Sequence, residues 1–327
     1  MSIMRYLSLF SGIGGFEVAI HQVFGDKAEC VGYSEIDKHA IAEYESHYPN
    51  HVNLGDITKL KKNDIDSLDK IDLIVGGFPC SDLSSANDQN RKGLNGQKSG
   101  LFWIMCNVIM WARTQNPNLQ IIIENNASMA HKWRDMITNK LCIVLKQTLY
   151  CNFFDSSQWV MQRRRRYYWT LKQIPEYYGT RKQSMNDVLV PINEAKQYKL
   201  KANAIMFLNS SPPHLHGYKG EIISIKGSCY KKKSVEYPTR LSNFGYSTTL
   251  DDYVKCLVTR YQSCFLLDYR LCSREHMFIP RYLAKSEFNR LFGYPENYVY
   301  TNRNSVYARL YGMTVVPPVV KHILLNL

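Results

Sequence analysis

A cysteine in a stiffened turn is the first residue of this chain whose setting suggests chemistry. Cys80 follows an apolar run at 71–75 and stands directly after Pro79, within the segment Gly-Phe-Pro-Cys-Ser-Asp-Leu-Ser at 77–84. A cysteine on a turn after a buried strand is a candidate nucleophile, and the N-terminus of a nearby helix would favour its thiolate. Proline stiffens such a turn. The alternative is a small buried hydrophobic side chain, which is what most free cysteines are.

Glu124 is a candidate for acid–base chemistry. It follows three isoleucines at 121–123, and such an apolar setting raises the pKa of a carboxyl group. A carboxyl with a raised pKa can donate a proton near neutral pH. The alternative is a helix N-cap residue.

Four arginines stand beside three aromatic residues in the segment Gln-Arg-Arg-Arg-Arg-Tyr-Tyr-Trp at 162–169. Guanidinium groups suit phosphate contacts, and aromatic rings suit base stacking. In a strand, Arg164 and Arg166 share one face. The alternative is a solvated basic edge strand.

A glycine-rich turn at 10–15 follows the first strand-like run of the chain. Glycines let the backbone approach a ligand at the positive end of the next helix. Glu35 lies roughly 20 positions further on, where an acidic residue can accept hydrogen bonds from ribose hydroxyls, and Asp56 is a candidate acceptor for an adenine amine. The spacing lacks the full G-x-G-x-x-G fingerprint, which disfavours a plain dinucleotide enzyme. The alternatives are a tight turn, solvated carboxylates and helix caps.

Alternating strands and helices must position these residues. The strand-like runs are 4–10, 30–34, 71–75 and 119–123, and the helix-like runs are 16–24, 38–47 and 101–111. Such alternation is typical of a doubly wound α/β sheet, whose binding crevice lies at the carboxyl ends of the strands. A further strand is expected before Asp56. Because the glycine turn, Glu35, Asp56, Cys80 and Glu124 all follow strands, the sequence predicts that they meet in one crevice.

Basic residues are concentrated in the second part of the chain. Residues 1–150 hold 15 basic and 16 acidic side chains, whereas residues 151–327 hold 26 and 12, so the net charge of +13 arises in the second part. A one-sided positive field attracts a polyanion, and nucleic acid is the first candidate. The alternative is a merely basic lobe. Apolar runs shorten after residue 171 and regular order returns near 281, which predicts a main domain at 1–171 plus 281–327 and a separate lobe at 172–280.

Composition excludes several classes of protein. The 327 residues, 45% hydrophobic and 21% charged, fit a packed globular protein of about two domains. No apolar run reaches the roughly 18 residues of a membrane span, and the first residues do not have a signal-peptide pattern. The nine cysteines form no C-x-x-C pair and no zinc-type spacing with histidine, so we expect neither a disulfide scaffold nor a metal site. An intracellular location, in a prokaryote or in a compartment that contains DNA, is expected.

Six motifs occur in the order found in DNA (cytosine-5) methyltransferases, and the chain resembles that family along nearly its whole length, residues 172–280 excepted. The motifs are Phe10-x-Gly12-x-Gly14, Pro79-Cys80, Glu124-Asn125, Gln162-x-Arg164-x-Arg166, the run from Arg281 to Pro295, and Gly312-Met313-Thr314. Segments 79–84, 91–94 and 292–295 are similar to the animal de novo enzymes. The resemblance implies a Rossmann-like S-adenosylmethionine-dependent methyltransferase sheet with a second, smaller target-recognition lobe at 172–280.

The resemblance also implies a reaction: transfer of a methyl group from S-adenosylmethionine to carbon 5 of cytosine in double-stranded DNA at a short specific sequence, with S-adenosylhomocysteine as product. The target base is flipped out of the duplex. Cys80 attacks carbon 6, because the ring carbon is a poor nucleophile until covalent addition breaks its aromaticity. Glu124 binds the exocyclic amine and protonates ring nitrogen 3. Arg166 holds the base and its phosphate, and Arg164 supports the site.

Binding residues follow from the same resemblance. Those implied for the cofactor are Phe10, Gly12, Gly14, Glu35, Ile36, Asp56, Pro79, Leu101 and Thr314. Those expected for DNA, where basic side chains of the lobe contact phosphates, are Ser84, Gln162, Lys231, Lys232, Lys233, Arg240 and Arg260. Three departures from the family pattern are found: Ile36 replaces a tryptophan that stacks on adenine, Asn126 replaces a valine, and Met313-Thr314 replaces Asn-Ser. None of these changes removes a reacting group, so we expect an active enzyme.

Other functions stay open at this stage. A transfer-RNA cytosine-5 methyltransferase uses the same motifs, but such enzymes typically carry Pro-Pro-Cys and Cys-Phe-Thr, which this chain lacks. A catalytically silent DNA-binding regulator is disfavoured by the joint presence of Cys80, Glu124 and Arg166. A dinucleotide oxidoreductase is disfavoured by the incomplete glycine fingerprint and the basic second part. We expect the chain to act on duplex DNA as a monomer, with no membrane and no metal.

Overall fold

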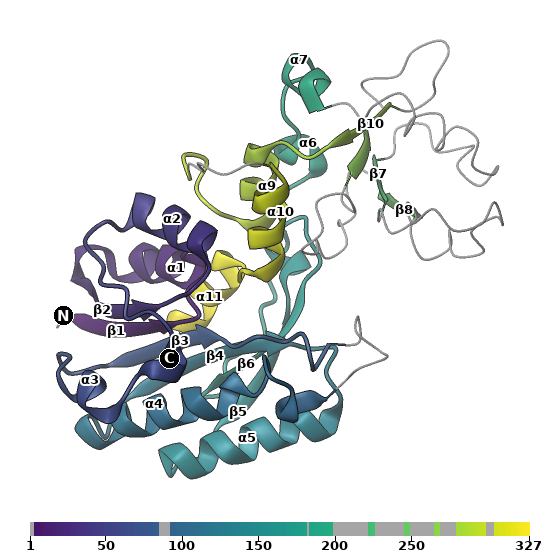
Figure 1. Cartoon of the computed structure of the whole chain (residues 1–327). Coiled ribbons are helices and arrows are strands. Elements are labelled where there is room, and N and C mark those ends of the chain that lie inside the picture. The colour runs from purple at the N-terminus through teal and green to yellow at the C-terminus, as the bar shows by residue number, and fades with distance from the viewer. Residues whose placement is uncertain are drawn as a thin grey trace. The chain divides into compact units, whose positions relative to one another are not determined.

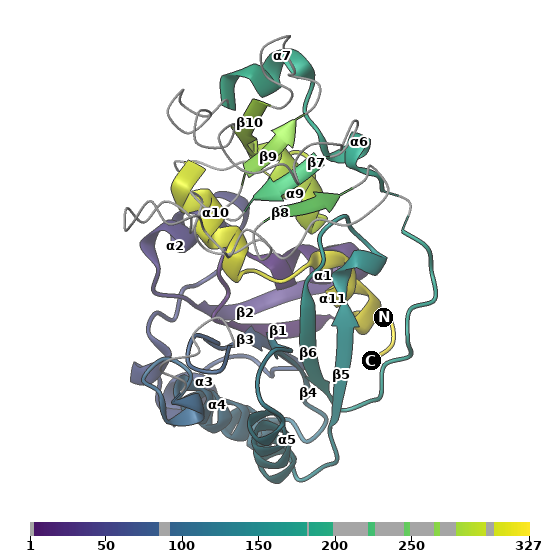
Figure 2. The same cartoon turned by 90° about the vertical axis from the view of Figure 1, so that its right-hand side faces the viewer.

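The computed structural model describes residues 3–84, 92–181, 183–198, 222–225, 245–248, 265–268, 279–298 and 304–327. The chain divides into two compact units: unit 1 comprises residues 1–156, 164–179 and 314–327, and unit 2 comprises residues 157–163 and 180–313. Residues 281–313, which the sequence groups with the main domain, therefore cluster with unit 2. Figures 1 and 2 show the chain from two directions.

Unit 1 is built on a six-stranded sheet with the order β2-β1-β3-β4-β6-β5. Its strands are β1 (Met4–Leu9), β2 (Ala28–Ser34), β3 (Leu73–Gly77), β4 (Gln120–Asn126), β5 (Tyr150–Asp155) and β6 (Arg165–Thr170). Strands β1 to β4 run parallel, whereas β6 is antiparallel to both β4 and β5. A parallel strand covered on both faces is a continuous apolar run, and the three isoleucines of β4 at 121–123 are fully buried.

Helices cover both faces of this sheet (Figure 1). On one face lie α1 (Gly15–Phe24), α2 (Lys38–His47) and α11 (Pro317–Leu324), and on the other lie α3 (Lys62–Asp66), α4 (Leu101–Gln115) and α5 (His131–Leu145). The main core combines buried side chains of the central strands with those of α4 and α5, such as Phe102, Met105 and Leu141. Short 3-10 turns are η1 (Gly25–Lys27), η2 (Ile57–Lys59), η4 (Gly93–Asn95), η5 (Ser156–Gln158) and η6 (Lys196–Tyr198).

Unit 2 contains a four-stranded antiparallel sheet with the order β10-β9-β7-β8. Its strands are β7 (Ile222–Ile225), β8 (Gly245–Thr248), β9 (Phe265–Asp268) and β10 (Ile279–Tyr282), and its helices are α6 (Met185–Val188), α7 (Ile192–Ala195), α9 (Lys285–Phe292) and α10 (Asn304–Met313). A fully buried ion pair joins β10 to α9: Arg281 Nη2 lies 2.6 Å from Glu287 Oε1. The same carboxylate accepts a hydrogen bond from the Val190 amide, so one charged pair connects three segments of this unit.

The α/β architecture expected from the sequence is confirmed. The structure corrects one local expectation and excludes two of the alternative interpretations. The strand expected before Asp56 is wrong among the described residues, because only an isolated bridge pairs Tyr33 with Asn53. Glu124 is not a helix N-cap, because β4 continues to Asn126. The arginine segment is not an edge strand, because β6 lies between β4 and β5.

Candidate active site

Cys80 lies on a turn that leaves the central strand β3. The backbone oxygen of Cys80 accepts hydrogen bonds from the amides of Leu83 and Ser84 at 3.0 and 2.9 Å. The side chain is partly exposed, so it is not the fully buried hydrophobic group of the alternative interpretation. A partly exposed thiol on a hydrogen-bonded turn at a strand's carboxyl end has the access that a nucleophile needs.

Two asparagines at the end of β4 hold the chain on both sides of Cys80. Asn125 Nδ2 donates to the backbone oxygen of Phe78 at 2.9 Å. Asn126 Nδ2 donates to Ser84 Oγ at 3.3 Å, and Asn126 Oδ1 accepts from the Ser128 amide at 2.9 Å. The departure from the family pattern at Asn126 therefore places a polar group that contacts the end of the Cys80 turn.

Glu124 and Arg166 form a buried ion pair beside this turn. Arg166 Nε lies 2.7 Å from Glu124 Oε1, and each side chain is 10% exposed. Strand register explains the pairing. Asn126 and Arg166 face each other across β4 and β6, and Glu124, two residues before Asn126, lies on the same face of β4 as a diagonal neighbour of Arg166. Burial raises the pKa of Glu124, while Arg166 and Arg164 oppose the rise, and the net direction is upward. A protonated carboxyl next to a cation can donate to a substrate and then receive the resulting charge.

The electrostatics of Cys80 depend on the same charges. Burial raises the pKa of its thiol, Arg166 and Arg164 lower it, Glu124 raises it, and the net direction is upward. Cys80 is followed by a turn over 81–84, so the helix N-terminus expected to favour its thiolate is not found among the described residues beside it. Burial therefore favours the neutral thiol of Cys80, and the two arginines partly offset this effect.

The glycine turn after β1 adopts the backbone that its sequence predicts. Gly12 and Gly14 have φ of 57° and 83°, and Phe10 has φ of 55°, which is uncommon for a residue with a side chain. Glu35 fixes this turn: its Oε2 accepts from the Gly12 amide at 3.0 Å, and its Oε1 accepts from the Ile36 and Asp37 amides at 2.7 and 2.8 Å. One carboxylate thus joins the loops that follow β1 and β2.

The other residues expected to bind the cofactor are in different settings. Ile36 is 66% exposed. Asp56 caps η2, because its Oδ1 accepts from the backbone and hydroxyl of Thr58, and these bonds hold its pKa below the usual range. Leu101 begins α4, and Thr314 is buried where the chain re-enters unit 1. Phe10, Glu35, Pro79 and Glu124 all follow or end parallel strands of one sheet, as the sequence predicts, whereas Arg166 comes from the antiparallel strand β6.

The expected DNA-binding residues are only partly described. Ser84 ends the Cys80 turn. Gln162 belongs to unit 2, is fully buried, and donates from Nε2 to the backbone oxygen of Leu291 at 3.5 Å; this contact gives it a packing role within its unit. The remaining residues, Lys231, Lys232, Lys233, Arg240 and Arg260, lie outside the described residues.

Sequence reasoning gave no role to Gly77, which shapes the site. Gly77 pairs with Glu124 across β3 and β4, and a Cβ atom at Gly77 would lie 2.7 Å from Glu124 Oε2. The missing side chain therefore makes room for the carboxylate. The signal is weak in the sequence, because a glycine pair before a turn also marks an ordinary strand end.

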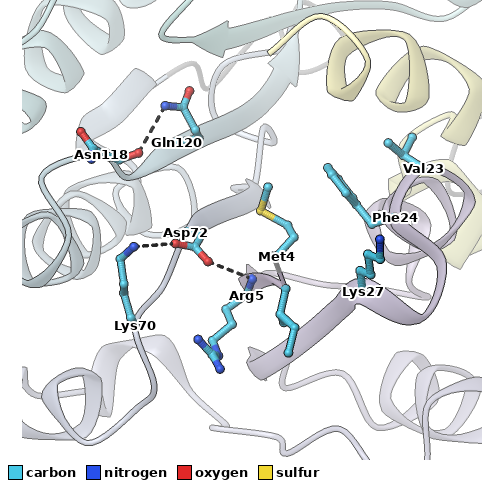
Figure 3. A pocket seen from close by; sticks show the side chains of 10 residues that line it. Met4, Arg5, Val23, Phe24, Lys27, Lys70, Asp72, Asn118 and Gln120 are labelled. Carbon is cyan, nitrogen blue, oxygen red and sulfur yellow. Dashed lines mark hydrogen bonds and ion pairs between the residues drawn. The ribbon is translucent and has the colours of Figure 1, made fainter. Parts of the chain in front are cut away.

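A cavity of about 810 Å³ lies at the opposite edge of the unit 1 sheet, at the amino ends of β1, β3 and β4 (Figure 3). Asp72 accepts there from the Arg5 amide at 3.2 Å and pairs with Lys70 Nζ at 3.2 Å. None of the residues expected to act in catalysis or binding lines this cavity. The site described above therefore stands on the geometry of its own residues at the carboxyl edge.

The fold and the site define a protein of the α/β methyltransferase type, with a cysteine nucleophile candidate at the carboxyl edge of its sheet. The family model for C-5 cytosine-specific DNA methylase matches residues 4–327, and the chain belongs to this family. The fold is similar to that of two solved structures. Schizosaccharomyces pombe Dnmt2 methyltransferase has a TM-score of 0.68 and 18% identity over 98% of this chain and 97% of that one. The Entamoeba histolytica methyltransferase EhMeth has a TM-score of 0.70 and 14% identity over 99% and 97%.

Curated relatives match shorter segments. Orphan methyltransferase M.Rho11sI of Bacillus phage rho11s is 43% identical over 105 residues, which are 32% of this chain and 20% of the relative. Type II methyltransferase M2.BsuMI of Bacillus subtilis (strain 168) is 35% identical over 147 residues, which are 45% of this chain and 35% of the relative. The matched segments thus span about a third or less of the relatives' own length.

The described residues contain no group of three or more His, Cys, Asp or Glu side chains placed to hold a metal ion. Within the same described ranges, no helix has the length and hydropathy needed to cross a bilayer.

Proposed function

We propose that this chain transfers a methyl group from S-adenosylmethionine to carbon 5 of cytosine in double-stranded DNA at a short specific sequence, through a covalent bond between Cys80 and a flipped base. The observation that carries the proposal is the buried Glu124–Arg166 pair at 2.7 Å beside the turn that presents Cys80. Family membership supports the same chemistry.

Cys80 begins and ends the reaction. Its thiolate adds to carbon 6 of cytosine, which forms the sulfur–carbon bond and shifts an electron pair toward carbon 5. Carbon 5 then takes the methyl group, a base removes the proton from carbon 5, and the electron pair returns as Cys80 leaves by elimination. Arg166 and Arg164 lower the pKa of the thiol against the effect of burial, so they increase the thiolate fraction at a given pH.

Glu124 supplies the proton that makes this addition possible. Burial raises the pKa of its carboxyl, so it can donate a proton to ring nitrogen 3 while it accepts a hydrogen bond from the exocyclic amine. The carboxylate that results is stabilised by Arg166 at 2.7 Å. Arg166 also contacts the base and its phosphate, and Arg164 supports the site.

The residues of the glycine turn fit S-adenosylmethionine, which supplies an electrophilic methyl group when bound. A Cβ atom at Gly12 would meet nothing within 4 Å, so there is open space beside this backbone. Among the described residues, the buried hydroxyl of Ser11 has no hydrogen-bond partner and is available to a ligand. Phe10, Gly14, Glu35, Ile36, Asp56, Pro79, Leu101 and Thr314 would complete the binding site.

Recognition of DNA is assigned to the lobe at 172–280 and catalysis to residues 1–171 plus 281–327. The positive charge of the second part of the chain supports this division, since a polyanion is attracted there. Lys231, Lys232, Lys233, Arg240 and Arg260 would contact phosphates, and Ser84 and Gln162 would contribute from outside the lobe. The chain acts as a monomer in this proposal.

The test offers radiolabelled S-adenosylmethionine with duplex DNA of many sequences, with transfer RNA, and with duplex DNA containing 5-fluorocytosine. We expect methylation of duplex DNA, a denaturation-resistant complex with the fluorinated duplex, and neither product with Cys80→Ala. Methylation of transfer RNA but not of duplex DNA would overturn the assignment of DNA as the substrate. Duplex binding without methylation or trapping would favour a silent regulator and overturn the proposal.

A further inference from the structure

A serine at the start of α4 bridges the two sides of the Cys80 turn. Ser99 Oγ donates to the backbone oxygen of Pro79 at 2.8 Å, and it accepts from the amide of Asp82 at 3.2 Å. Pro79 precedes Cys80 directly and Asp82 follows it by two residues. The fully buried hydroxyl of Ser99 therefore fixes the distance between the Pro79 oxygen and the Asp82 amide, and Cys80 lies between these two groups.

The carboxylate of Asp82 also binds the segment that contains Ser99. Asp82 Oδ2 accepts from the amides of Ser99 and Lys98 at 2.9 and 3.2 Å. The backbone oxygen of Asp82 accepts from the Gly93 amide at 3.0 Å. Both the backbone and the side chain of Asp82 are therefore hydrogen-bonded. These bonds join the Cys80 turn to residues 93–99, which precede α4.

Gly96 makes this arrangement sterically specific. A Cβ atom at Gly96 would lie 2.3 Å from both Cγ and Oδ2 of Asp82. The backbone of Gly96 has no positive φ, so an alanine there is opposed by this contact and not by backbone strain. Any side chain at Gly96 would move the Asp82 carboxylate away from its position.

We propose that Asp82 and Ser99 are positioning residues for Cys80: the Asp82–Ser99 pair anchors the nucleophile turn to the start of α4 and so holds the sulfur in line with carbon 6 of the target base. The inference rests on the proposed role of Cys80. Neither residue touches the reacting atoms. Loss of the pair leaves the thiol in place but widens the range of positions it samples, which slows addition because covalent attack requires a near-attack geometry.

The experiment measures single-turnover trapping on duplex DNA containing 5-fluorocytosine, together with kcat, KM for DNA and the affinity for S-adenosylmethionine. For Ser99→Ala we expect trapping and kcat to fall about 5- to 10-fold, the effect of losing a buried, hydrogen-bonded hydroxyl. The affinity for S-adenosylmethionine should fall less than the trapping rate, because Ser99 bonds to the backbone oxygen, not the side chain, of Pro79 and the glycine turn is untouched. Asp82→Ala should show a larger loss. Asp82→Asn keeps an acceptor oxygen and should retain most of the rate.

Gly96→Ala provides a variant that removes no polar group, and it should slow trapping as Ser99→Ala does. Ser67→Ala is the matched control, since that exposed hydroxyl donates to the Asp64 backbone oxygen in α3 and its loss should leave trapping unchanged.

Trapping by Ser99→Ala and Gly96→Ala at the wild-type rate overturns the inference and leaves the proposed function standing. A second outcome also overturns the inference: in every variant the trapping rate, the affinity for S-adenosylmethionine and the thermal midpoint all fall together, and Asp82→Asn does not restore the rate. The pair would then serve only folding. Absence of trapping by the wild type itself overturns the proposed function, and the inference with it.

Discussion

Gly77 and Glu124 are register partners on the parallel strands β3 and β4, and the place where a Cβ atom would stand at Gly77 lies 2.7 Å from Glu124 Oε2. The central strand of the sheet therefore leaves room for the catalytic carboxyl group proposed here. The neighbouring glycine faces a different obstacle, since a Cβ atom at Gly76 would lie 2.8 Å from the backbone oxygen of Leu9.

This difference predicts two distinct phenotypes. Gly77→Ala displaces the buried Glu124 carboxylate beside Arg166, so we expect methyl transfer reduced about 10- to 100-fold, the effect of misplacing a reacting group by about 1 Å. Gly76→Ala presses on the backbone of β1, which cannot move as a side-chain end can, and should lower the thermal midpoint more than Gly77→Ala does. Methyl-transfer assays and thermal unfolding of both variants check this. Equal loss of stability in the two variants would contradict the assignment.

The charges around Cys80 predict shifts of opposite sign in its reactivity. Arg166 is the largest influence that lowers the pKa of the thiol, so Arg166→Gln should move the pH profile of Cys80 alkylation to higher pH. Arg164→Gln should do so to a smaller extent. Glu124→Gln removes a charge that raises this pKa and should move the profile to lower pH.

Peptide mass spectrometry after timed iodoacetamide treatment separates Cys80 from the other eight cysteines. Cys106 is an internal control, because burial raises the pKa of its thiol to about 12, and Lys140, not Arg166 or Glu124, opposes the rise. Its profile should be the same in all variants. A shift of the same sign for Arg166→Gln and Glu124→Gln would show that the charges act on Cys80 through altered folding and not directly.

The sequence predicts the parts of this site that follow from strand periodicity. Cys80, Glu124 and Glu35 were expected at the carboxyl ends of strands because apolar runs precede them, and the sheet confirms those strands. The contacts of Asn126 with Ser84 and of Asp82 with Ser99 were not foreseen. They join loops whose meeting depends on the exact path of each turn, and short polar residues in loops have many equally plausible partners.

Grouping of distant segments is also hard to foresee. The sequence gives no sign that the amide of Gln162 donates to the backbone oxygen of Leu291, which lies 129 residues away. The shortening of apolar runs after residue 171 and the return of regular order near 281 carry no information on which segments pack together. Long-range contacts of this kind depend on three-dimensional packing, so sequence reasoning locates the change in texture and not the units themselves.

The buried ion pair of unit 2 predicts a large effect on stability. Glu287 is fully buried and bonded in a bidentate manner by Arg281. Arg281→Met leaves an unpaired buried carboxylate and should cost about 3–5 kcal/mol in the free energy of unfolding. Arg290→Gln breaks a pair whose partner, Glu296, is largely exposed, together with a hydrogen bond to the Val188 backbone oxygen at 3.0 Å, and should cost about 1–2 kcal/mol. Urea unfolding of both variants tests the contrast, and equal losses would contradict it.

The exposed side chain of Ile36 predicts a gain of function. It stands where many members of the family place a tryptophan, and it is 66% exposed, so a larger ring is sterically allowed. Ile36→Trp should tighten S-adenosylmethionine binding several-fold, since stacking on an aromatic ring contributes about 1 kcal/mol. Ile143→Trp, on an exposed position of α5, is the matched control and should leave the dissociation constant unchanged. Titration calorimetry measures both, and equal effects would argue against adenine binding beside Ile36.

A buried carboxyl in the first turn of α1 predicts a pH dependence of stability. Glu17 in α1 is fully buried, and burial raises its pKa to about 7, although Ser8 and Tyr44 oppose the rise. The folded state therefore holds this proton more tightly than the unfolded chain, whose carboxyl has a pKa of about 4.3. Its contribution to stability is complete below that value and is lost as the pH rises through 7. The loss is about 4 kcal/mol at most.

Glu17→Gln removes this titration, so the difference in unfolding free energy between wild type and variant should change in favour of the variant from pH 5 to pH 8. Burial lowers the pKa of neighbouring His51 to about 4, which gives a slope of opposite sign that both proteins share. Glu296→Gln is the comparison variant: Arg290 lowers the pKa of Glu296, so its effect should change only in the acid range. Urea unfolding at four pH values decides the matter, because a difference between wild type and Glu17→Gln that stays constant from pH 5 to pH 8 would mean that Glu17 does not titrate there.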